Sequence, residues 1–535
     1  MVARVADNSY AHMLLTSFNW SFSKLESTIV PFSRGEDHYI TNYFVKFLQS
    51  SAYFLALAAS SILAIPGLTM RAIKPYIDPI HRFDNIDWTR ERVDNLVFSR
   101  DMKFGVATAD YQVNGAGNFP HCTWADYENK HNLPVEQRSG MALDDWHHMD
   151  DVIARLKILG VNSYRFSVER CAIEPERGVF SSEAIEHYVE FCRKLKETGI
   201  EPIVTMHHFN NPSWFDELGG FEREENIAEF TQYCVEIYRA LSPYVQYWAT
   251  FNEPNLYAFT GYVMGQHPPE KAGDFKTAAI VLENMFKAHV EIYRAIKEID
   301  GSHNSKIGIV HDVLRTVAYH SWNPIELAAA HYMTRITHDV FMKFFKEGVF
   351  EYQMPFFANE KYVDATAPQT LDWLGVNYYS DPLLSEELSR KFLVSTCFPN
   401  QEMTDLTYPG QGNAYRNYPQ GLYSAIAECS ELGKEMLVTE NGIVAEDDEK
   451  RAEFYRRALY MVSKAQQDGY NVKGYCPWTL SDNYEWTVGW TPGGRASVGG
   501  FGLFAFNKET KEHTLRPSSK VYIDAIAGWR QTVGA

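Results

Sequence analysis

Short apolar runs rich in β-branched residues recur along the chain from about Met102 onward. The segments between them carry apolar residues at three- and four-residue spacing, as in 144–159 and 182–198, which is typical of amphipathic helices. Eight strands alternating with helices predict an α/β fold, a closed (β/α)₈ TIM barrel over residues 96–535. The predicted strands are Lys103–Ala109, Asn162–Val168, Glu201–His207, Gln246–Asn252, Lys306–His311, Leu371–Asn377, Glu435–Glu440 and Val472–Trp478.

The region before the barrel has a different pattern. Residues 47–70 contain no charged side chain, and Lys46 and Arg71 flank this stretch on both sides. Its apolar part is long enough to enter or cross a bilayer, although Gln49 and four serines interrupt it. We therefore expect residues 1–95 to form a helical N-terminal extension. Within it, residues 43–70 are either a membrane contact or a helical cap packed on the barrel.

Charge and cysteine usage exclude several classes of function. The formal net charge is −18 and no basic stripe offsets it, which argues against a nucleic-acid partner. The 7 cysteines are odd in number and never form a CxxC motif, so neither a disulfide framework nor a zinc site is indicated. This cysteine usage indicates a protein of a reducing compartment. We expect a cytoplasmic protein, with membrane association through the N-terminal segment as the alternative.

Two glutamates occupy strand ends, where the catalytic groups of such barrels project. Glu253 follows the fourth predicted strand and Glu440 ends the seventh. We expect Pro254 to hold Glu253 in an extended conformation and Gly442 to permit a tight turn after Glu440. A single glutamate of this kind more often caps a helix or pairs with arginine. Two of them at strand ends favour a catalytic pair.

Several motifs occur together in one order along the chain. In that order they resemble glycoside hydrolase family 1 over roughly residues 100 to 530. An ordered set is far more specific than any single string. The motifs are Phe104–Thr108 with Gln112, Tyr164–Ser167, Thr250–Pro254, Asp372–Tyr379, Val438–Gly442, and Pro477–Trp478 followed by Asp482–Trp486.

The resemblance implies that Glu253 is the general acid/base and Glu440 the nucleophile of a retaining β-glycosidase. Such enzymes place their two carboxyl groups about 5–5.5 Å apart. At that distance each negative charge raises the pKa of the other group, so one acid stays protonated while its partner is ionised. When Glu440 is esterified its charge disappears, and Glu253 can then act as a base. This reaction requires no cofactor and no metal.

The resemblance also assigns contacts around the pair. Arg165 and Tyr379 would support the nucleophile, and Trp478 would form the floor of the sugar site. Taken alone, Arg165 and His208 could equally be structural, and the tryptophans could be core residues. The implied substrate-binding residues are Gln112, His208, Asn252, Asn377, Tyr379, Trp478, Glu485 and Trp486.

Three positions depart from the family pattern. Asn114, Arg170 and Asn210 stand where the family usually has other residues, and we expect them to lie beside the sugar site. They leave open which glycone and aglycone are accepted. The loop at residues 491–500 is expected to rim the pocket. Arg495 is the only basic residue between Trp486 and that loop's end, which favours an unphosphorylated sugar.

Three functions fit these observations to different degrees. The first is hydrolysis of a terminal β-D-glucoside or a related small-molecule β-glycoside. The second is transglycosylation to an alcohol or lipid acceptor by the same residues, for which the apolar N-terminal segment makes a glycolipid partner reasonable. The third is a catalytically inactive carbohydrate-binding barrel. This last function predicts the loss of one carboxylate, whereas both Glu253 and Glu440 are present.

Overall fold

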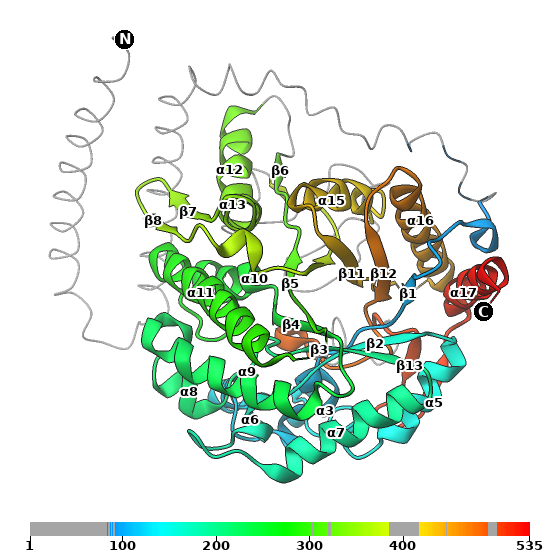
Figure 1. Cartoon of the computed structure of the whole chain (residues 1–535), viewed down its shortest axis with the longest axis horizontal. Coiled ribbons are helices and arrows are strands. Elements are labelled where there is room, and N and C mark those ends of the chain that lie inside the picture. Colours follow the sequence, from blue (N-terminus) through cyan, green and yellow to red (C-terminus); the bar gives the residue numbers. More distant parts are fainter. Residues whose placement is uncertain are drawn as a thin grey trace, which may run out of the picture.

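The structure is a computed structural model (Figure 1). It describes residues 83, 86, 88, 91–301, 304–318, 323–384, 417–445, 447–489 and 500–534. The apolar stretch at 43–70 and most of the predicted rim loop lie outside these residues. Within the described part of the chain, no helix combines the length and hydropathy that a membrane crossing needs.

Eight parallel strands form one sheet that curls into a barrel. The order around it is β1-β12-β11-β9-β5-β4-β3-β2. The ring closes where the amide of Thr108 donates to the carbonyl of Arg165 at 2.9 Å, and that of Arg165 to Val106 at 3.0 Å. All eight predicted strands are confirmed. They are β1 (Lys103–Phe104), β2 (Ser163–Ser167), β3 (Glu201–Thr205), β4 (Tyr247–Asn252), β5 (Lys306–Asp312), β9 (Trp373–Asn377), β11 (Glu435–Asn441) and β12 (Val472–Pro477).

Helices surround the strands (Figure 1). The helix predicted over 182–198 is confirmed as α7, whereas that over 144–159 begins only at Met149, because Ala142 and Asp144 adopt positive φ in the preceding turns. The helices are α3 (Asp110–Asn118), α4 (Thr123–Lys130), α5 (Met149–Leu159), α6 (Arg170–Ile173), α7 (Ser182–Glu197), α8 (Ser213–Glu217), α9 (Ile227–Leu241), α10 (Pro254–Ala258), α11 (Phe275–Ile299), α12 (Pro324–Thr334), α13 (Val340–Glu347), α15 (Gly421–Cys429), α16 (Asp448–Gln467) and α17 (Lys520–Val533).

In the described residues, three small strand pairs lie outside the barrel. One is a hairpin that follows α13, another precedes α17, and the third joins the segments after β5 and β9. The pairs are β7 (Val349–Met354) with β8 (Ala358–Val363), β13 (Phe504–Phe506) with β14 (His513–Leu515), and β6 (Val317–Ala318) with β10 (Leu383–Leu384).

The barrel interior is filled by side chains from alternate strand positions. A Cβ on Gly308 would lie 2.5 Å from the Trp373 ring, so only glycine fits opposite that indole. Because side chains alternate along a strand, a residue two positions beyond an interior residue, at the carboxyl end of the strand, points into the barrel mouth. The interior cluster consists of Ile203, Tyr247, Ala249, Val310, Trp373 and Leu437.

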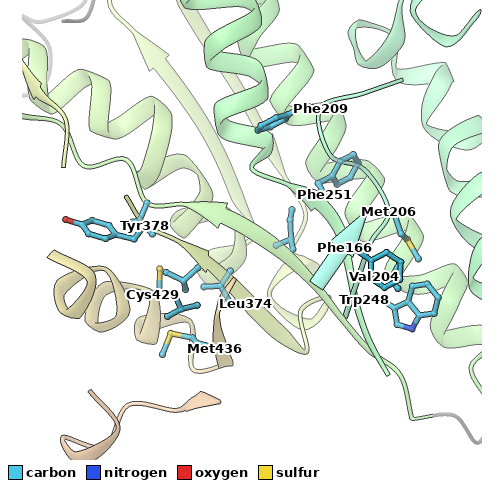
Figure 2. Close-up of a cluster of buried hydrophobic side chains, with 14 of the residues drawn as sticks. Phe166, Val204, Met206, Phe209, Trp248, Phe251, Leu374, Tyr378, Cys429 and Met436 are labelled. Carbon is cyan, nitrogen blue, oxygen red and sulfur yellow. The ribbon is translucent and has the colours of Figure 1, made fainter. Parts of the chain in front are cut away.

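A second apolar layer lies between the strands and the helices. Figure 2 shows Leu374 and Met436 near Cys429 of α15, and Phe166, Val204 and Trp248 together elsewhere around the barrel. This layer extends to the few described residues before the barrel. Phe83 packs against Tyr423 with ring centroids 5.1 Å apart. The division of the chain near residue 95 remains a prediction, since most of residues 1–95 lie outside the described part.

Candidate active site

Glu440 lies at the end of β11 in a charge-compensated setting. Its side chain is buried, with 4% of the residue exposed. One carboxylate oxygen accepts a hydrogen bond from the fully buried guanidinium of Arg165 on β2. The other accepts from the hydroxyl of Tyr379 at 2.8 Å. An ionised carboxylate survives burial only with such partners, so these two donors favour the charged form of Glu440.

Glu253 ends β4 in an unusual backbone conformation. Its φ and ψ are 46° and 58°, in the left-handed region, so the extended conformation predicted for it is wrong. Pro254 disfavours right-handed helical geometry in the preceding residue, and here it begins α10. The turn from strand to helix is therefore made at one residue. The Glu253 amide donates to the Val310 carbonyl at 2.9 Å, which fixes the turn on β5.

The Glu253 carboxyl group lies in a different setting from that of Glu440. It is 3% exposed and accepts one hydrogen bond, from the side-chain amide of Asn377 at 2.6 Å. Among the described residues no cation forms an ion pair with it. Burial raises the pKa of Glu253 well above its usual range, and the charges of Asp312 and Glu440 raise it further. This environment favours a protonated acid.

Two asparagines connect the carboxyl groups. The Arg165 guanidinium donates to the Asn252 side-chain oxygen at 2.6 Å. Asn377, which donates to Glu253, accepts from the Thr439 hydroxyl at 2.7 Å. The donor and acceptor atoms of both asparagine side chains are thus determined by their partners on β2 and β11. This network holds both acids in place.

His208 follows β3 and contacts the same network. Its Nε2 accepts from the Asn252 side-chain amide at 3.2 Å. Burial and the nearby Arg165 charge lower the pKa of His208 well below its usual range, so the ring is neutral. The proton then resides on Nδ1, for which the described residues provide no hydrogen-bond partner.

Gln112 and Glu485 lie at the β1 and β12 side of the mouth. The Gln112 side-chain amide donates to the Tyr484 carbonyl at 2.7 Å and to Glu485 at 3.1 Å. The Trp478 indole donates to the other Glu485 oxygen at 3.3 Å. Burial raises the pKa of Glu485 to about 8. The Gln112 side-chain oxygen has no partner among the described residues, which leaves an acceptor for a hydroxyl.

Aromatic rings line the site. The His208 ring stacks at 5.9 Å on both Trp478 and Trp486, with interplanar angles of 27° and 23°. Trp124, which contacts Trp486 at 4.8 Å, extends this surface outward. Flat apolar faces beside hydrogen-bonding groups suit a sugar ring, whose C–H groups can pack on the indole while its hydroxyls bond. Every site residue predicted from the sequence is therefore brought to this end of the barrel.

The three positions that depart from the family pattern bond to residues around the barrel mouth. Asn114 donates to Asp110 and accepts from the Trp146 amide, and Asn210 donates to Glu169 and accepts from the amide of Trp124. The Arg170 guanidinium pairs with Glu174 at 2.8 Å and lies 4.5 Å from the centre of the Phe215 ring. These contacts fix the three side chains in the layer around the barrel mouth. Their place beside a bound sugar stays a prediction.

One carboxylate of the mouth was missed. The fifth strand continues one residue beyond the predicted end to Asp312, which is 4% exposed. The alternation of side chains along a strand could have indicated this residue. Val310 faces the barrel interior, so Asp312, two residues later, is expected on the same side of the strand. In the described residues, no group of three or more His, Cys, Asp or Glu side chains is placed to hold a metal ion.

Comparisons with known proteins agree with this geometry. Residues 95–529 match the family model for glycosyl hydrolase family 1. The chain is 26% identical to β-glucosidase A of Acetivibrio thermocellus, covering 81% of this chain and 99% of that protein. It is 28% identical to a 6-phospho-β-galactosidase of Leptotrichia buccalis, with 79% and 97% covered. A solved β-glycosidase from Pyrococcus horikoshii superposes with a TM-score of 0.68 at 31% identity, over 82% of this chain and 98% of the other.

Proposed function

Because this chain belongs to glycosyl hydrolase family 1, we propose that it hydrolyses terminal β-D-glucosides with retention, using Glu440 as nucleophile and Glu253 as acid/base. One observation carries the assignment of roles. Glu440 is bound by a guanidinium and a phenol, whereas Glu253 has no cation partner among the described residues and a raised pKa. The donors around Glu440 suit a nucleophile and the raised pKa of Glu253 suits a proton donor, which are the two roles that double displacement requires.

In the first step, Glu440 attacks the anomeric carbon while Glu253 protonates the departing glycosidic oxygen. The bond from the anomeric carbon to that oxygen breaks as the bond to the Glu440 oxygen forms. The proton of Glu253 leaves with the aglycone alcohol. Tyr379 and Arg165 hold Glu440 so that its attacking oxygen needs little reorganisation.

In the second step, water hydrolyses the glycosyl ester. Esterification removes the negative charge of Glu440, so one of the charges that raise the pKa of Glu253 disappears. Glu253, now ionised, takes a proton from the water that attacks the anomeric carbon. Glu440 leaves as a carboxylate and recovers its two donors. The sugar is released with its original configuration.

The glycone is held on the β1 and β12 side of the mouth. Gln112 and Glu485 present an amide and a carboxyl group that suit adjacent hydroxyls, and Trp478 provides an apolar face. A site built to bond a hydroxyl discriminates strongly against a sugar that lacks it. A 6-phosphate would bring negative charge into an acidic pocket, and Arg495 is the only basic residue from Thr487 to Gly500. We therefore favour an unphosphorylated glucoside.

The test is a panel of aryl β-glycosides with gluco, galacto, fuco, manno and 6-phospho glycones. Wild type should turn over the glucoside best. Glu440→Gln should lower kcat/KM on the order of 1,000-fold or more, because the covalent route is lost. Glu253→Ala should lose about 100- to 10,000-fold with poor leaving groups, since general acid catalysis is removed.

Two controls separate the roles. Added azide should restore turnover of Glu253→Ala and yield a β-glycosyl azide, because a small anion attacks the glycosyl-enzyme without a base. Added alcohol tests transfer, since wild type should release free glucose at an undiminished yield if hydrolysis dominates. Near-wild-type turnover by Glu440→Gln would overturn the mechanism. A preference for the 6-phospho substrate would overturn the substrate assignment.

A further inference from the structure

Asp312 brings a third carboxyl group to the barrel mouth, on the side of Glu253. It is the last residue of β5 and pairs in register with Asn377 of β9. Residues that pair directly on neighbouring strands point to the same face of a sheet, and the Asn377 side chain donates to Glu253 in the mouth. The preceding residue, His311, bonds to His338 at 2.9 Å on the other face. The Asp312 side chain therefore points into the mouth.

Hydrogen bonds hold the backbone of Asp312 on both sides. The side-chain amide of Asn255 donates to the Asp312 carbonyl at 2.8 Å and to the Thr337 carbonyl at 2.9 Å. The Val313 amide donates to the Asn377 carbonyl at 3.0 Å. These bonds fix the direction in which the Asp312 side chain leaves the strand. A rigidly held side chain of this kind can contact a ligand with a defined geometry.

The carboxyl group of Asp312 has no partner in the part of the chain that the structure describes. The residue is 4% exposed, and no described residue forms a hydrogen bond or an ion pair with this group. Glu440, by contrast, has two donors and Glu253 has one. A buried polar group without a partner destabilises a protein, so a ligand that supplies the missing bond would bind favourably. A carboxyl group accepts hydrogen bonds whether or not it is ionised, so this argument does not depend on its charge.

The place of Asp312 in the ring indicates which part of the substrate it meets. The proposed glycone contacts Gln112 and Glu485 lie on the β1 and β12 side, whereas β5 lies next to β4 on the opposite side of the barrel. Glu253 at the end of β4 protonates the departing oxygen, and a general acid must lie within hydrogen-bond reach of that atom. A side chain beside Glu253 and away from the glycone contacts therefore faces the aglycone, next to the glycosidic oxygen.

We infer that Asp312 selects the leaving group, because its carboxyl group accepts a hydrogen bond from a hydroxyl that the aglycone carries next to the glycosidic oxygen. The inference rests on the proposed function and names the class of aglycone for the same site. Sugars, vicinal diols and catechols carry such a hydroxyl, whereas simple alcohols and phenols do not. A substrate without the hydroxyl leaves Asp312 buried and unpartnered, and sites of this kind discriminate strongly.

The test uses two aryl β-glucosides that differ in one hydrogen-bond donor. The 2-hydroxyphenyl glucoside carries a hydroxyl beside the glycosidic oxygen, and the 2-methoxyphenyl glucoside keeps that oxygen without its proton. The quantity measured is the ratio of their kcat/KM values for one enzyme, in which effects common to both substrates cancel. Wild type should favour the 2-hydroxyphenyl glucoside about 10-fold, which is the effect of one hydrogen bond in a buried site.

Two variants decide whether Asp312 is the acceptor. Asp312→Asn keeps an acceptor oxygen at nearly constant size and should retain most of the preference. Asp312→Leu has a similar shape and no acceptor, so the preference should fall to about 2-fold or less. The bulk of the methoxy group is the same in every measurement, so a difference between the two variants reports the hydrogen bond.

Three results would overturn the inference. The first is a wild-type ratio near one, and the second is an unchanged ratio in Asp312→Leu. The third is an equal loss of the preference in Asp312→Asn and Asp312→Leu, because the asparagine oxygen can still accept. Asp312→Ala replaces the leucine variant if the latter does not fold.

The failure of this inference is distinguishable from the failure of the proposed function. If Glu440→Gln is inactive and azide rescues Glu253→Ala, the two catalytic roles stand, and an unchanged ratio removes only the role of Asp312. If Glu440→Gln retains activity, the roles on which the inference rests are themselves wrong. If the panel shows that another glycone is preferred, the two aglycones are attached to that glycone, so the choice of sugar is tested apart from Asp312.

Discussion

On the β11 side of the barrel mouth, Glu440 lies between a guanidinium and a phenol, whereas on the β4 and β5 side Glu253 and Asp312 lie without a bound cation among the described residues. All three side chains are carboxyl groups at the ends of parallel strands, and all are almost fully buried. What separates them is the partner supplied from across the barrel. β2 supplies Arg165 to the Glu440 carboxylate on β11, and among the described residues no cation pairs with the carboxyl groups of Glu253 or Asp312.

On the proposed mechanism, this difference would give two acids of one fold opposite tasks. Compensation by donors favours the ionised form, and like charge with burial favours the protonated form. Glu440 on the compensated side would provide the nucleophile, and Glu253 on the uncompensated side would provide the proton. Removing the partners of each side in turn tests this comparison.

The largest effect is expected from Arg165→Met. This change leaves Glu440 buried without its cation, and breaking a buried pair in this way typically costs about 3–5 kcal/mol of unfolding free energy. The kcat/KM of the folded protein should fall on the order of 1,000-fold, because Glu440 then takes up a proton and is a poor nucleophile. Both quantities are measured, by denaturant unfolding and by aryl glucoside kinetics.

Arg170→Met is the matched control for Arg165→Met. Arg170 is also buried and paired with a glutamate, Glu174, but it lies among aromatic rings outside the site. Its removal should destabilise the protein comparably and leave kcat/KM per folded molecule within about 3-fold of wild type. If both variants lost activity equally, the special role of Arg165 would be refuted.

A smaller loss is expected from Tyr379→Phe. The substitution removes one neutral donor from Glu440 and keeps Arg165. A hydrogen bond to a charged group contributes about 1.5–3 kcal/mol, so kcat should fall roughly 10- to 100-fold. An unchanged kcat with a raised KM would instead assign Tyr379 to substrate binding alone.

On the other side of the mouth, Asn377→Ala should act mainly on pH dependence. The Asn377 amide donates to Glu253 and lowers its pKa against the raising effects of burial and charge. Without that donor, the alkaline limb of kcat/KM should move to higher pH. We expect a rate loss of about 10-fold or less at the optimum. A shift to lower pH would contradict the assignment.

The smallest effect concerns stability. The folded-state pKa of Glu253 is raised, so the folded protein holds this proton more tightly than the unfolded chain does. Holding this proton stabilises the folded state fully at pH values below the ordinary glutamate pKa. The stabilising effect is lost as pH rises through the folded-state pKa of Glu253. The free energy of unfolding of Glu253→Gln should therefore exceed that of wild type by about 1 kcal/mol at pH 8. This difference should be smaller at pH 5. Glu440→Gln should show no such gain, because it leaves Arg165 unpaired.

Most of the fold could be predicted from the sequence. The eight strands were recognised because each is a run of apolar residues that fills either the interior or the outer layer, as Val310 and Ile309 do on β5. Strand ends were less well defined. The predicted fifth strand stopped at His311, because a charged residue usually marks the exposed end of a strand, whereas Asp312 is buried in the mouth.

The residues predicted for the site lie together in the structure, but their geometry could not be predicted. Ordered motifs identified the two glutamates and their neighbours, which the structure brings together. The backbone at Glu253 was predicted wrongly, because a following proline excludes one region of conformational space without choosing between the others. Long-range partners could not be predicted from sequence spacing either. Arg170 illustrates this, since its position near the site motifs did not disclose that it pairs with Glu174.

The left-handed conformation of Glu253 has a consequence for directed evolution. A non-glycine residue with φ of 46° costs free energy that glycine, and to a lesser extent asparagine, would avoid. A library selected only for thermal tolerance should therefore accept glycine here readily and return stable, inactive proteins. Selection for turnover should retain glutamate, although glycine would make the protein more stable. Position 253 is thus a place where the two selections would choose different residues, and where stabilising campaigns need an activity screen from the first round.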